Sequence, residues 1–343
     1  MQIAVIINGH GGYLKKAYSN DPKLGYRLEK KIEKSGLNGI VYEPFIEDMS
    51  SLFTHLKRNK GDSKLLICSW GGDATLLYVT SYAINYFKDC LDDIYFHALK
   101  GGSTNTGIKA SSGYCNPIES IDYIIENLSN KRSLHHNDIN TILVPSKHLN
   151  LPIDEFTSRL CGQGAEANII EEYESGFMEK GLPKVAYIAS RAIPSALIKG
   201  DYAKRLGKPM ISTIYVDGEK VVDSERMTAV VINSIENLFP FFKPFYGVDK
   251  GMHLIATSWD TKRIIKNILK VKAQTRIKEE GWYDFPNSQE VRLITHEEDN
   301  PKIVIDGNIF AIPPDTTLKL GPKTKMIASP NKGGKILNWT AIC

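Results

Sequence analysis

Three glycine-rich turns in the first third of the chain carry residues that could bind phosphate. They span residues 8–12, 71–75 and 101–107, and each directly follows a short apolar run. Glycines let the backbone approach a ligand closely, and the amides of a helix that starts after such a turn favour an anion. Asp73, in the second turn, would repel a bare phosphate. We therefore expect its carboxylate to hold a metal ion or a ribose hydroxyl, or to take the proton of an attacking alcohol.

Buried strands have to position these turns. The apolar runs Ile3–Ile7, Leu65–Ser69 and Ile94–Leu99 have the length of strands, and amphipathic helical spacing lies between them. This alternation predicts a doubly wound parallel sheet, and the carboxyl edge of such a sheet is where ligands bind. A Gly-Gly-Asp sequence on its own is also common in plain strand-to-helix connections, and that alternative stays open.

The predicted secondary structure changes after about Asn137, where runs typical of strands outnumber helical ones. Asp217-Gly218 stands between two such runs and predicts a hairpin, whereas Val185–Ile198 and Trp259–Val271 read as helices. We expect an antiparallel β-sandwich as a second domain, with the active cleft between the domains. The predicted division is 1–135 for the α/β domain, 136–320 for the β-rich domain and 321–343 for a C-terminal segment.

Composition and charge exclude several classes of function. The chain has 43 Lys and Arg against 39 Asp and Glu, a net charge of +4, which is too small to indicate nucleic-acid binding. No apolar run reaches the roughly 20 residues of a membrane span, and the N-terminal run does not fit a signal peptide. The five cysteines show no metal-binding spacing. We expect a cytoplasmic protein that touches membranes peripherally; the sequence does not fix its oligomeric state.

The order of the three turns resembles the diacylglycerol kinase catalytic domain family, which includes bacterial lipid kinases and sphingosine kinases. The resemblance rests on Asn8-Gly-x-Gly-Gly, on Gly71-Gly72-Asp73-Ala74-Thr75 and on Gly102-Ser103-Thr104-Asn105, and it covers most of the chain. It implies an α/β nucleotide-binding domain, a β-sandwich domain with a lipid cleft, and a chain end that returns to the first domain. It also implies ATP and Mg²⁺ as cofactors and a lipid substrate at the membrane surface.

The resemblance assigns roles to individual residues. Asp73 and Asp306 would be the catalytic carboxylates, Asp138 would face the nucleotide, and Asp249 would stand near a structural Mg²⁺. The residues expected to hold ATP and its phosphates are Asn8, Gly71, Gly72, Thr75, Gly102, Ser103, Thr104, Asn105 and Lys109.

The chain also departs from the family pattern. Thr106 replaces an Asp, and Asn308 replaces the Glu of the family's Asp-Gly-Glu. Asn308 cannot take a proton at neutral pH, so proton abstraction would fall to Asp73 or Asp306. Glu166 stands where relatives have an Asp; the alternative is an exposed carboxylate that complements a helix dipole. The aromatic residues of 237–246 either line the lipid cleft or pack between sheets.

Three hypotheses follow from these patterns. The leading one is an ATP-dependent kinase that phosphorylates a hydroxyl of a diacylglycerol-like or sphingoid lipid. The second is a relative that binds nucleotide or lipid without turnover, favoured by Asn308 and Thr106. The third is a NAD kinase, which shares the Gly-Gly-Asp turn and a β-rich second half.

Overall fold

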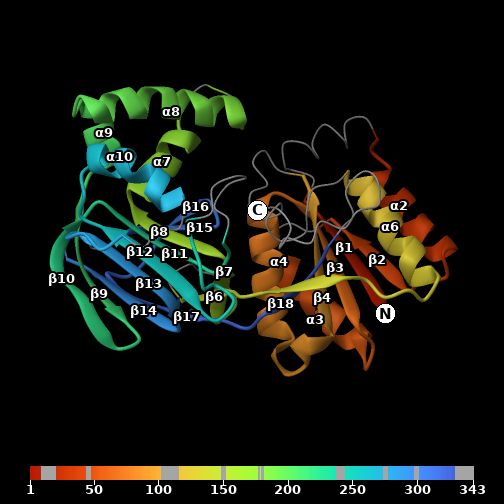
Figure 1. Cartoon of the computed structure of the whole chain (residues 1–343). Helices are drawn as coiled ribbons and strands as arrows, with labels where there is room; N and C mark the ends of the chain where they lie inside the picture. Colours follow the sequence, from red (N-terminus) through yellow and green to blue (C-terminus); the bar gives the residue numbers. More distant parts are fainter. Residues whose placement is uncertain are drawn as a thin grey trace. The chain divides into compact units, whose positions relative to one another are not determined.

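The chain folds into two compact units. The computed structural model describes residues 1–8, 21–43, 48–101, 116–147, 152–176, 178, 181–236, 244–272, 277–296 and 301–328. The first unit comprises Met1–Ile139 together with the chain from Lys323 onward, and the second comprises Asn140–Pro322. Figure 1 shows the two units, and each is described by itself below.

The first unit is built on a six-stranded sheet with the order β2-β1-β3-β4-β18-β5. Every neighbouring pair is parallel except β18 with β5. All seven residues of β3 are buried, as expected of a parallel strand covered on both faces. The doubly wound parallel sheet predicted from the sequence is therefore confirmed. Its strands are β1 (Gln2–Ile7), β2 (Gly39–Tyr42), β3 (Leu65–Gly71), β4 (Ile94–Lys100), β5 (His136–Ile139) and β18 (Thr324–Ile327).

Helices cover the sheet of the first unit. Leu28 of α2 and Ile124 of α6 join one apolar cluster with Val5 of β1. Phe53 of α3 stacks on Tyr82 of α4, with ring centroids 5.8 Å apart. The helices are α2 (Leu24–Lys34), α3 (Met49–Lys60), α4 (Asp73–Tyr86) and α6 (Pro117–Ser129), with a 3-10 helix, η2 (Lys88–Asp93), between α4 and β4.

Strand β18, from the C-terminal part of the chain, completes this sheet. It pairs in parallel with β4 and in antiparallel with β5. The buried ring of His97 on β4 ties it in place: Nδ1 lies 3.1 Å from the carbonyl oxygen of Ile327, and Nε2 lies 2.7 Å from Ser120 Oγ of α6. The carbonyl can only accept, so Nδ1 carries the proton and the Ser120 hydroxyl donates to Nε2.

The second unit contains two antiparallel six-stranded sheets, with the orders β10-β9-β14-β17-β6-β7 and β13-β12-β11-β8-β15-β16. Phe156 of β7 contacts Phe310 of β16, and the Tyr283 hydroxyl of β13 donates to Glu225 of β10 at 2.6 Å, so the sheets pack face to face. The predicted sandwich is confirmed. The strands are β6 (Ile142–Pro145), β7 (Glu155–Ser158), β8 (Leu160–Gly164), β9 (Met210–Val216), β10 (Glu219–Met227), β11 (Ala229–Asn233), β12 (Met252–Thr257), β13 (Trp282–Ser288), β14 (Glu290–Thr295), β15 (Lys302–Ile305), β16 (Asn308–Ala311) and β17 (Asp315–Leu320).

Four helices of the second unit gather beside the sheet that contains β8 (Figure 1). They are α7 (Ala165–Glu174), α8 (Leu182–Leu197), α9 (Asp201–Leu206) and α10 (Thr261–Lys272). Helix α7 packs on β8, β11, β15 and β16, and α8 packs on α7, α9 and α10. Among the described residues, no helix has the length and apolar character needed to cross a bilayer.

Candidate functional site

The turns after β1, β3 and β4 lie at one edge of the parallel sheet. The three strands are direct neighbours, with Ile7 paired to Trp70 and Gly71 paired to Lys100. Because the strands run in the same direction, their carboxyl ends meet at this edge. Asn8, Gly72 with Asp73, and Gly101 are the first residues beyond the three strands.

Asn8 and Thr75 fasten two of these turns together. The Asn8 side-chain amide donates to Thr75 Oγ1 at 3.0 Å, and the Asn8 backbone amide donates to the Trp70 carbonyl at 2.9 Å. A Cβ at Gly71 would lie 2.1 Å from Thr75 Oγ1, so only glycine leaves room for this threonine. The sequence predicts Asn8, Gly71 and Thr75 as site residues, and the structure brings the three together.

Helix α4 directs its N-terminus toward the same edge. Gly72 precedes the helix in an extended conformation, and no side chain caps the helix at this residue. The first amides of a helix lack partners within the helix and carry its positive partial charge. Asp73 lies half-buried in the first turn of α4. A phosphate would suit these amides, and the Asp73 carboxylate beside it would require a cation between the two.

The third turn cannot be followed beyond its start. The predicted ligands Gly102, Ser103, Thr104, Asn105 and Lys109, and the departure at Thr106, lie outside the described residues. Gly101 is buried, and the Trp70 indole donates to the carbonyl of the preceding Lys100 at 3.1 Å. This bond ties the end of β4 to β3, a link that the sequence analysis missed because it joins residues 30 positions apart.

Asp138 is not brought to this edge. It lies on β5 opposite Lys325 of β18, and Lys325 in turn pairs with Tyr95 near the start of β4. The register therefore places Asp138 toward the amino end of the sheet, whereas Gly71 and Lys100 mark its carboxyl end. The Asp138 side chain is 53% exposed and lies 3.8 Å from the His136 ring. Its predicted contact with nucleotide stays a prediction.

Asp306, in the second unit, belongs to a tight hairpin between β15 and β16. Asp306 and Gly307 both have positive φ, 45° and 81°, as the two central residues of a type I′ turn require. The carboxylate oxygen Oδ1 accepts from Ser158 Oγ at 3.0 Å and from the amides of Arg159 and Leu160 at 2.9 and 2.8 Å. Burial raises the pKa of the Asp306 carboxyl, and the nearby Arg159 opposes that shift.

The same arrangement occurs at Asp217-Gly218, which confirms the hairpin predicted there. Both residues again have positive φ, and Asp217 Oδ1 accepts from the amides of Gln289 and Glu290 at 2.7 and 2.8 Å. The Asp217 backbone amide donates to the Glu290 carbonyl, just as that of Asp306 donates to Leu160. The contacts of Asp306 thus give it a structural role in the hairpin, whether or not its carboxylate also takes part in chemistry.

Asn308 opens β16 directly after this hairpin. Its side-chain amide approaches the carbonyls of Ile305 and Asp306 at 3.5 and 3.3 Å. These contacts hold the amide within its own turn, and an amide supplies no base.

Glu166 lies against β8 from the first turn of α7. Its Oε2 is buried without a hydrogen-bond partner in the described structure, and a Cβ at Gly162 would lie 1.7 Å from that atom. Burial raises the pKa of the Glu166 carboxyl to about 8. The alternative of an exposed first-turn carboxylate therefore does not hold, and the structure instead holds a neutral acid under α7 at neutral pH.

Of the aromatic residues in the segment 237–246, the structure describes Phe245 and Tyr246. Phe245 is buried, and both rings pack edge-on against the buried His253. His253 accepts from the Tyr246 amide at Nδ1, so its Nε2 donates to Asp284 at 2.7 Å. Both ring nitrogens of His253 are hydrogen-bonded, so this residue has a structural role within the unit. Phe245 and Tyr246 pack against it, as expected if the aromatic residues of this segment pack within the unit.

Asp249 is exposed in the turn at residues 248–250, next to Lys250. Within the described parts of the chain, no three His, Cys, Asp or Glu side chains gather as they would around a metal ion. The Mg²⁺ expected at Asp249 from the resemblance stays a prediction.

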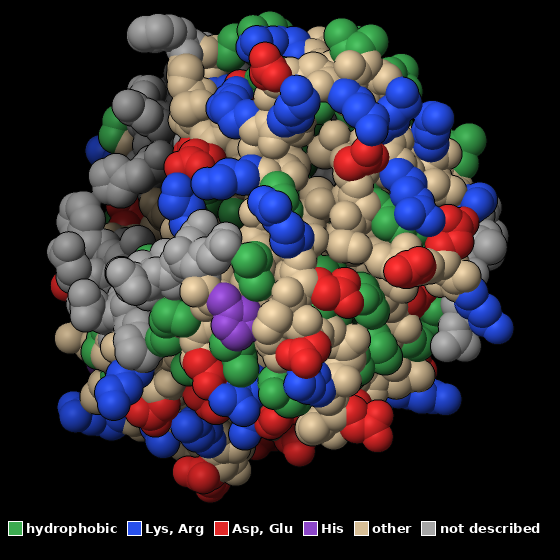
Figure 2. Space-filling model, turned by 90° about the vertical axis from the view of Figure 1, so that its left-hand side faces the viewer, with side chains coloured by type: hydrophobic (Ala, Val, Ile, Leu, Met, Phe, Trp, Pro, Cys, Tyr) green, Lys and Arg blue, Asp and Glu red, His purple; other side chains and the backbone are tan. Residues whose placement is uncertain are grey.

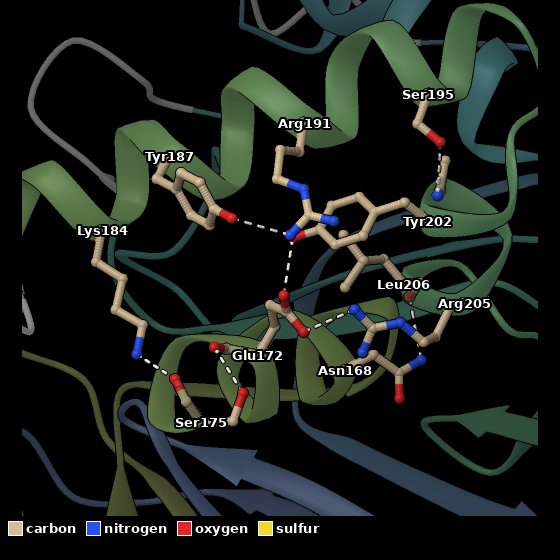
Figure 3. Close-up of polar contacts among 11 residues, drawn as sticks. Asn168, Glu172, Ser175, Lys184, Tyr187, Arg191, Ser195, Tyr202, Arg205 and Leu206 are labelled. Carbon is tan, nitrogen blue, oxygen red and sulfur yellow. Dashed lines mark hydrogen bonds and ion pairs between the residues drawn. The ribbon is translucent and has the colours of Figure 1, made fainter. Parts of the chain in front are cut away.

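A pocket of about 230 Å³ opens in the second unit beside α7 and α9. Glu172 accepts there from Arg205 at 2.8 Å and from the Tyr202 hydroxyl at 3.1 Å, and these bonds appear in Figure 3. The Arg205 hydrogen bond is the main cause that lowers the pKa of Glu172. The pocket is lined by Asn168, Glu171, Glu172, Ser175, Arg205 and Leu206.

Comparisons with known proteins support the fold. No family model and no curated protein matches this sequence. Among solved structures, a "putative diacylglycerol kinase" from Bacillus anthracis str. Sterne is 15% identical, with a TM-score of 0.61 over 96% of this chain and 97% of that chain. Two further structures from that strain, one described as a "putative diacylglycerol kinase" and the other as a diacylglycerol kinase, are 12% and 13% identical, with TM-scores of 0.59. The chain covers 98% and 97% of those two, and they cover 97% and 96% of it. The likeness predicted from three short motifs is thus confirmed for the fold over almost the whole chain.

Proposed function

We propose that this protein is an ATP-dependent lipid kinase that transfers the γ-phosphoryl group to a hydroxyl of a diacylglycerol-like or sphingoid lipid. The observation that carries the proposal is the edge where Asn8, Thr75 and the uncapped start of α4 meet. The fold shared with proteins described as diacylglycerol kinases supports it.

The residues at this edge fit a nucleotide phosphate. The start of α4 offers backbone amides and a positive partial charge, and the carboxylate of Asp73 stands beside them. Bound ATP would supply the phosphoryl group, and Mg²⁺ would neutralise charge on its oxygens. A Mg²⁺ ion is usually held by one or two carboxylates and the substrate phosphates, so Asp73 alone is a sufficient protein ligand.

The chain's own part in the reaction is mainly positioning. The hydrogen bond from Asn8 to Thr75 holds the turns after β1 and β3 together, and this would position the phosphates of bound ATP. Asp73 either holds the cation or orients the lipid hydroxyl. Phosphoryl transfer through a loose transition state needs little early proton abstraction, so a chain with Asn308 in place of a Glu can still work. Asp306 stays the second candidate carboxylate.

The test is a transfer assay with the full chain, labelled ATP and Mg²⁺. Diacylglycerol and sphingosine are offered in mixed detergent micelles, and NAD is offered in a parallel reaction. We expect label in one of the two lipids and none in NAD. Label in NAD alone would make the protein a NAD kinase, and nucleotide binding without transfer to any acceptor would make it a binding protein.

A further inference from the structure

Helix α8 of the second unit directs several polar side chains inward, beside the buried Ile188 and Ala196, and turns other large apolar side chains to solvent. Lys184, Arg191 and Ser195 share one side of the helix, because their spacing of seven and four residues returns to the same face. Figure 3 shows these three side chains directed toward α7 and α9. Surface helices of globular proteins normally bury the apolar face, so this orientation is unusual.

Specific polar contacts hold the inward side. The Lys184 side chain is 4% exposed, and its ammonium donates to the Ser175 carbonyl. The Arg191 guanidinium lies 4.3 Å from the centre of the Tyr202 ring. Ser195 Oγ accepts from the Ala203 amide at 3.0 Å. These polar contacts, together with the buried side chains of Ile188 and Ala196, hold the orientation of α8.

The outward side carries large apolar side chains. Ile193 is 47% exposed, Leu197 is 44% exposed and Ile198, directly after the helix, is 80% exposed. On the neighbouring α10, Leu269 is 74% exposed. Nine of the twelve exposed large hydrophobic residues in the described structure lie between Ile169 and Leu269 on α7, α8, α10 and the segments beside α8. We call the exposed apolar residues of α8 and α10, together with Ile198, the helical patch.

Positive charge surrounds the helical patch. Apart from the inward-directed Lys184 and Arg191, residues 181–210 contain four Lys or Arg and one Asp, and α10 contains five Lys or Arg and no acidic residue. Some of these cations form ion pairs, as Lys199 does with Asp260 and Arg263 does with Glu279. The positive charge near the patch comes from the Lys and Arg residues that outnumber the acidic ones. Figure 2 shows Lys and Arg side chains gathered over the upper part of the face, where α8 to α10 of Figure 1 lie.

We propose that the helical patch docks on the surface of an anionic phospholipid membrane. A helix with an apolar face, flanked by Lys and Arg, lies in the plane of the interface with its apolar side chains among the lipid headgroups. Charge complementarity favours this occupant, because each basic residue near an anionic surface strengthens binding about fivefold. The proposal rests on the proposed function, since a lipid kinase has to reach its substrate in a membrane.

The test is co-sedimentation of the full chain with vesicles, without ATP. Vesicles of phosphatidylcholine with about 30% phosphatidylglycerol are compared with vesicles of phosphatidylcholine alone, at low and high salt. We expect binding to the anionic vesicles that weakens as the salt screens the charges. A native protein that does not sediment with anionic vesicles at low salt overturns the proposal.

Variants locate the contact. Ile193→Ser with Leu197→Ser is expected to weaken binding at least tenfold. The matched change Ile118→Ser, at an exposed position of α6 in the first unit, is expected to leave binding unchanged. Lys262→Glu with Lys266→Glu on α10 is expected to weaken binding similarly, and Lys57→Glu, at an exposed position of α3, is the control. Equal binding by the native chain and both double variants overturns the proposal.

Two further measurements separate the alternatives. If light scattering shows that the α8 changes split a dimer while vesicle binding persists, a second copy of the chain occupies the patch and the proposal fails. Transfer of phosphate in mixed micelles is measured on the same variants and is expected to be kept. A native chain that binds vesicles but phosphorylates no lipid contradicts only the proposed function.

Discussion

At the scale of single residues, Glu166 gives the sharpest prediction about stability. Its carboxyl has a pKa of about 8 in the folded protein against 4.5 ordinarily, because it is buried. The folded state therefore keeps a proton that the unfolded chain releases, and stability falls as the pH rises from 4.5 to 8. We expect Glu166→Gln, which cannot ionise, to remove a loss of about 4 kcal/mol over this range. Urea unfolding at pH 5, 6.5 and 8 measures it.

The control for Glu166 lies on the same helix. Glu171 is exposed and paired with Lys302 at 2.7 Å, so Glu171→Gln is expected to change stability by less than about 1 kcal/mol at any of these pH values. A Glu166→Gln variant whose stability depends on pH as steeply as the native protein's would show that the carboxyl is not buried as described.

Asp306 allows its structural and chemical roles to be separated. Asp306→Ala removes an acceptor of three hydrogen bonds and is expected to cost about 3 kcal/mol of the free energy of unfolding. Asp306→Asn keeps an oxygen acceptor and forms the Asn-Gly pair that type I′ turns favour, so we expect a cost of about 1 kcal/mol or less. Chemical denaturation of both variants measures the difference.

Asp217→Ala is the matched control, because its carboxylate makes the equivalent bonds at an exposed hairpin. We expect it to cost less than Asp306→Ala, and the reverse order would contradict the description of the two hairpins. Since Asp306→Asn keeps the fold, any loss of phosphate transfer in that variant reports the charge of the carboxylate. Unchanged turnover would leave Asp306 as a turn residue only.

At the scale of elements, the attachment of β18 depends on His97. Burial lowers the pKa of His97 to about 4 from 6.5. Between these pH values the unfolded chain binds a proton at His97 and the folded protein does not. Stability is thus lost as the pH falls from 6.5 to 4, by about 3 kcal/mol for this residue. His97→Gln is expected to show a shallower loss over this range in unfolding experiments. The control is His55→Gln, a change at an exposed position of α3. Equal slopes for His97→Gln and the native protein would refute the assignment.

The elements themselves were largely predictable from local patterns. The run Leu65–Ser69 predicted β3 (Leu65–Gly71), and Val185–Ile198 predicted α8 (Leu182–Leu197), because continuous apolar runs and helical spacing are local signals. The bond from Asn8 to Thr75 and the register that places Asp138 away from the carboxyl edge of the sheet were not predictable. Both depend on pairing between strands far apart in the sequence, which no short window contains.

At the scale of the whole molecule, the net charge of the chain does not show how its charged residues are distributed. A net charge of +4 gives only a weak reason to expect membrane contact, whereas α10 alone carries five Lys or Arg without an acidic residue. The sequence also placed α8 as a helix without indicating which side faces out. That depends on Lys184 and Arg191 finding partners on α7 and α9, which only the folded unit shows.

In the proposed function, Asp73 and the edge around it serve the transfer of phosphate from ATP to a lipid. The most direct measurement is the rate of transfer to diacylglycerol or sphingosine in mixed micelles at saturating ATP and Mg²⁺, for the native chain, Asp73→Asn and the exposed control Asp62→Asn. We expect transfer by the native chain and the control, and a rate lower by about a hundredfold or more for a folded Asp73→Asn. Equal rates for Asp73→Asn and the native chain, or no transfer to any lipid by the native chain, would contradict it.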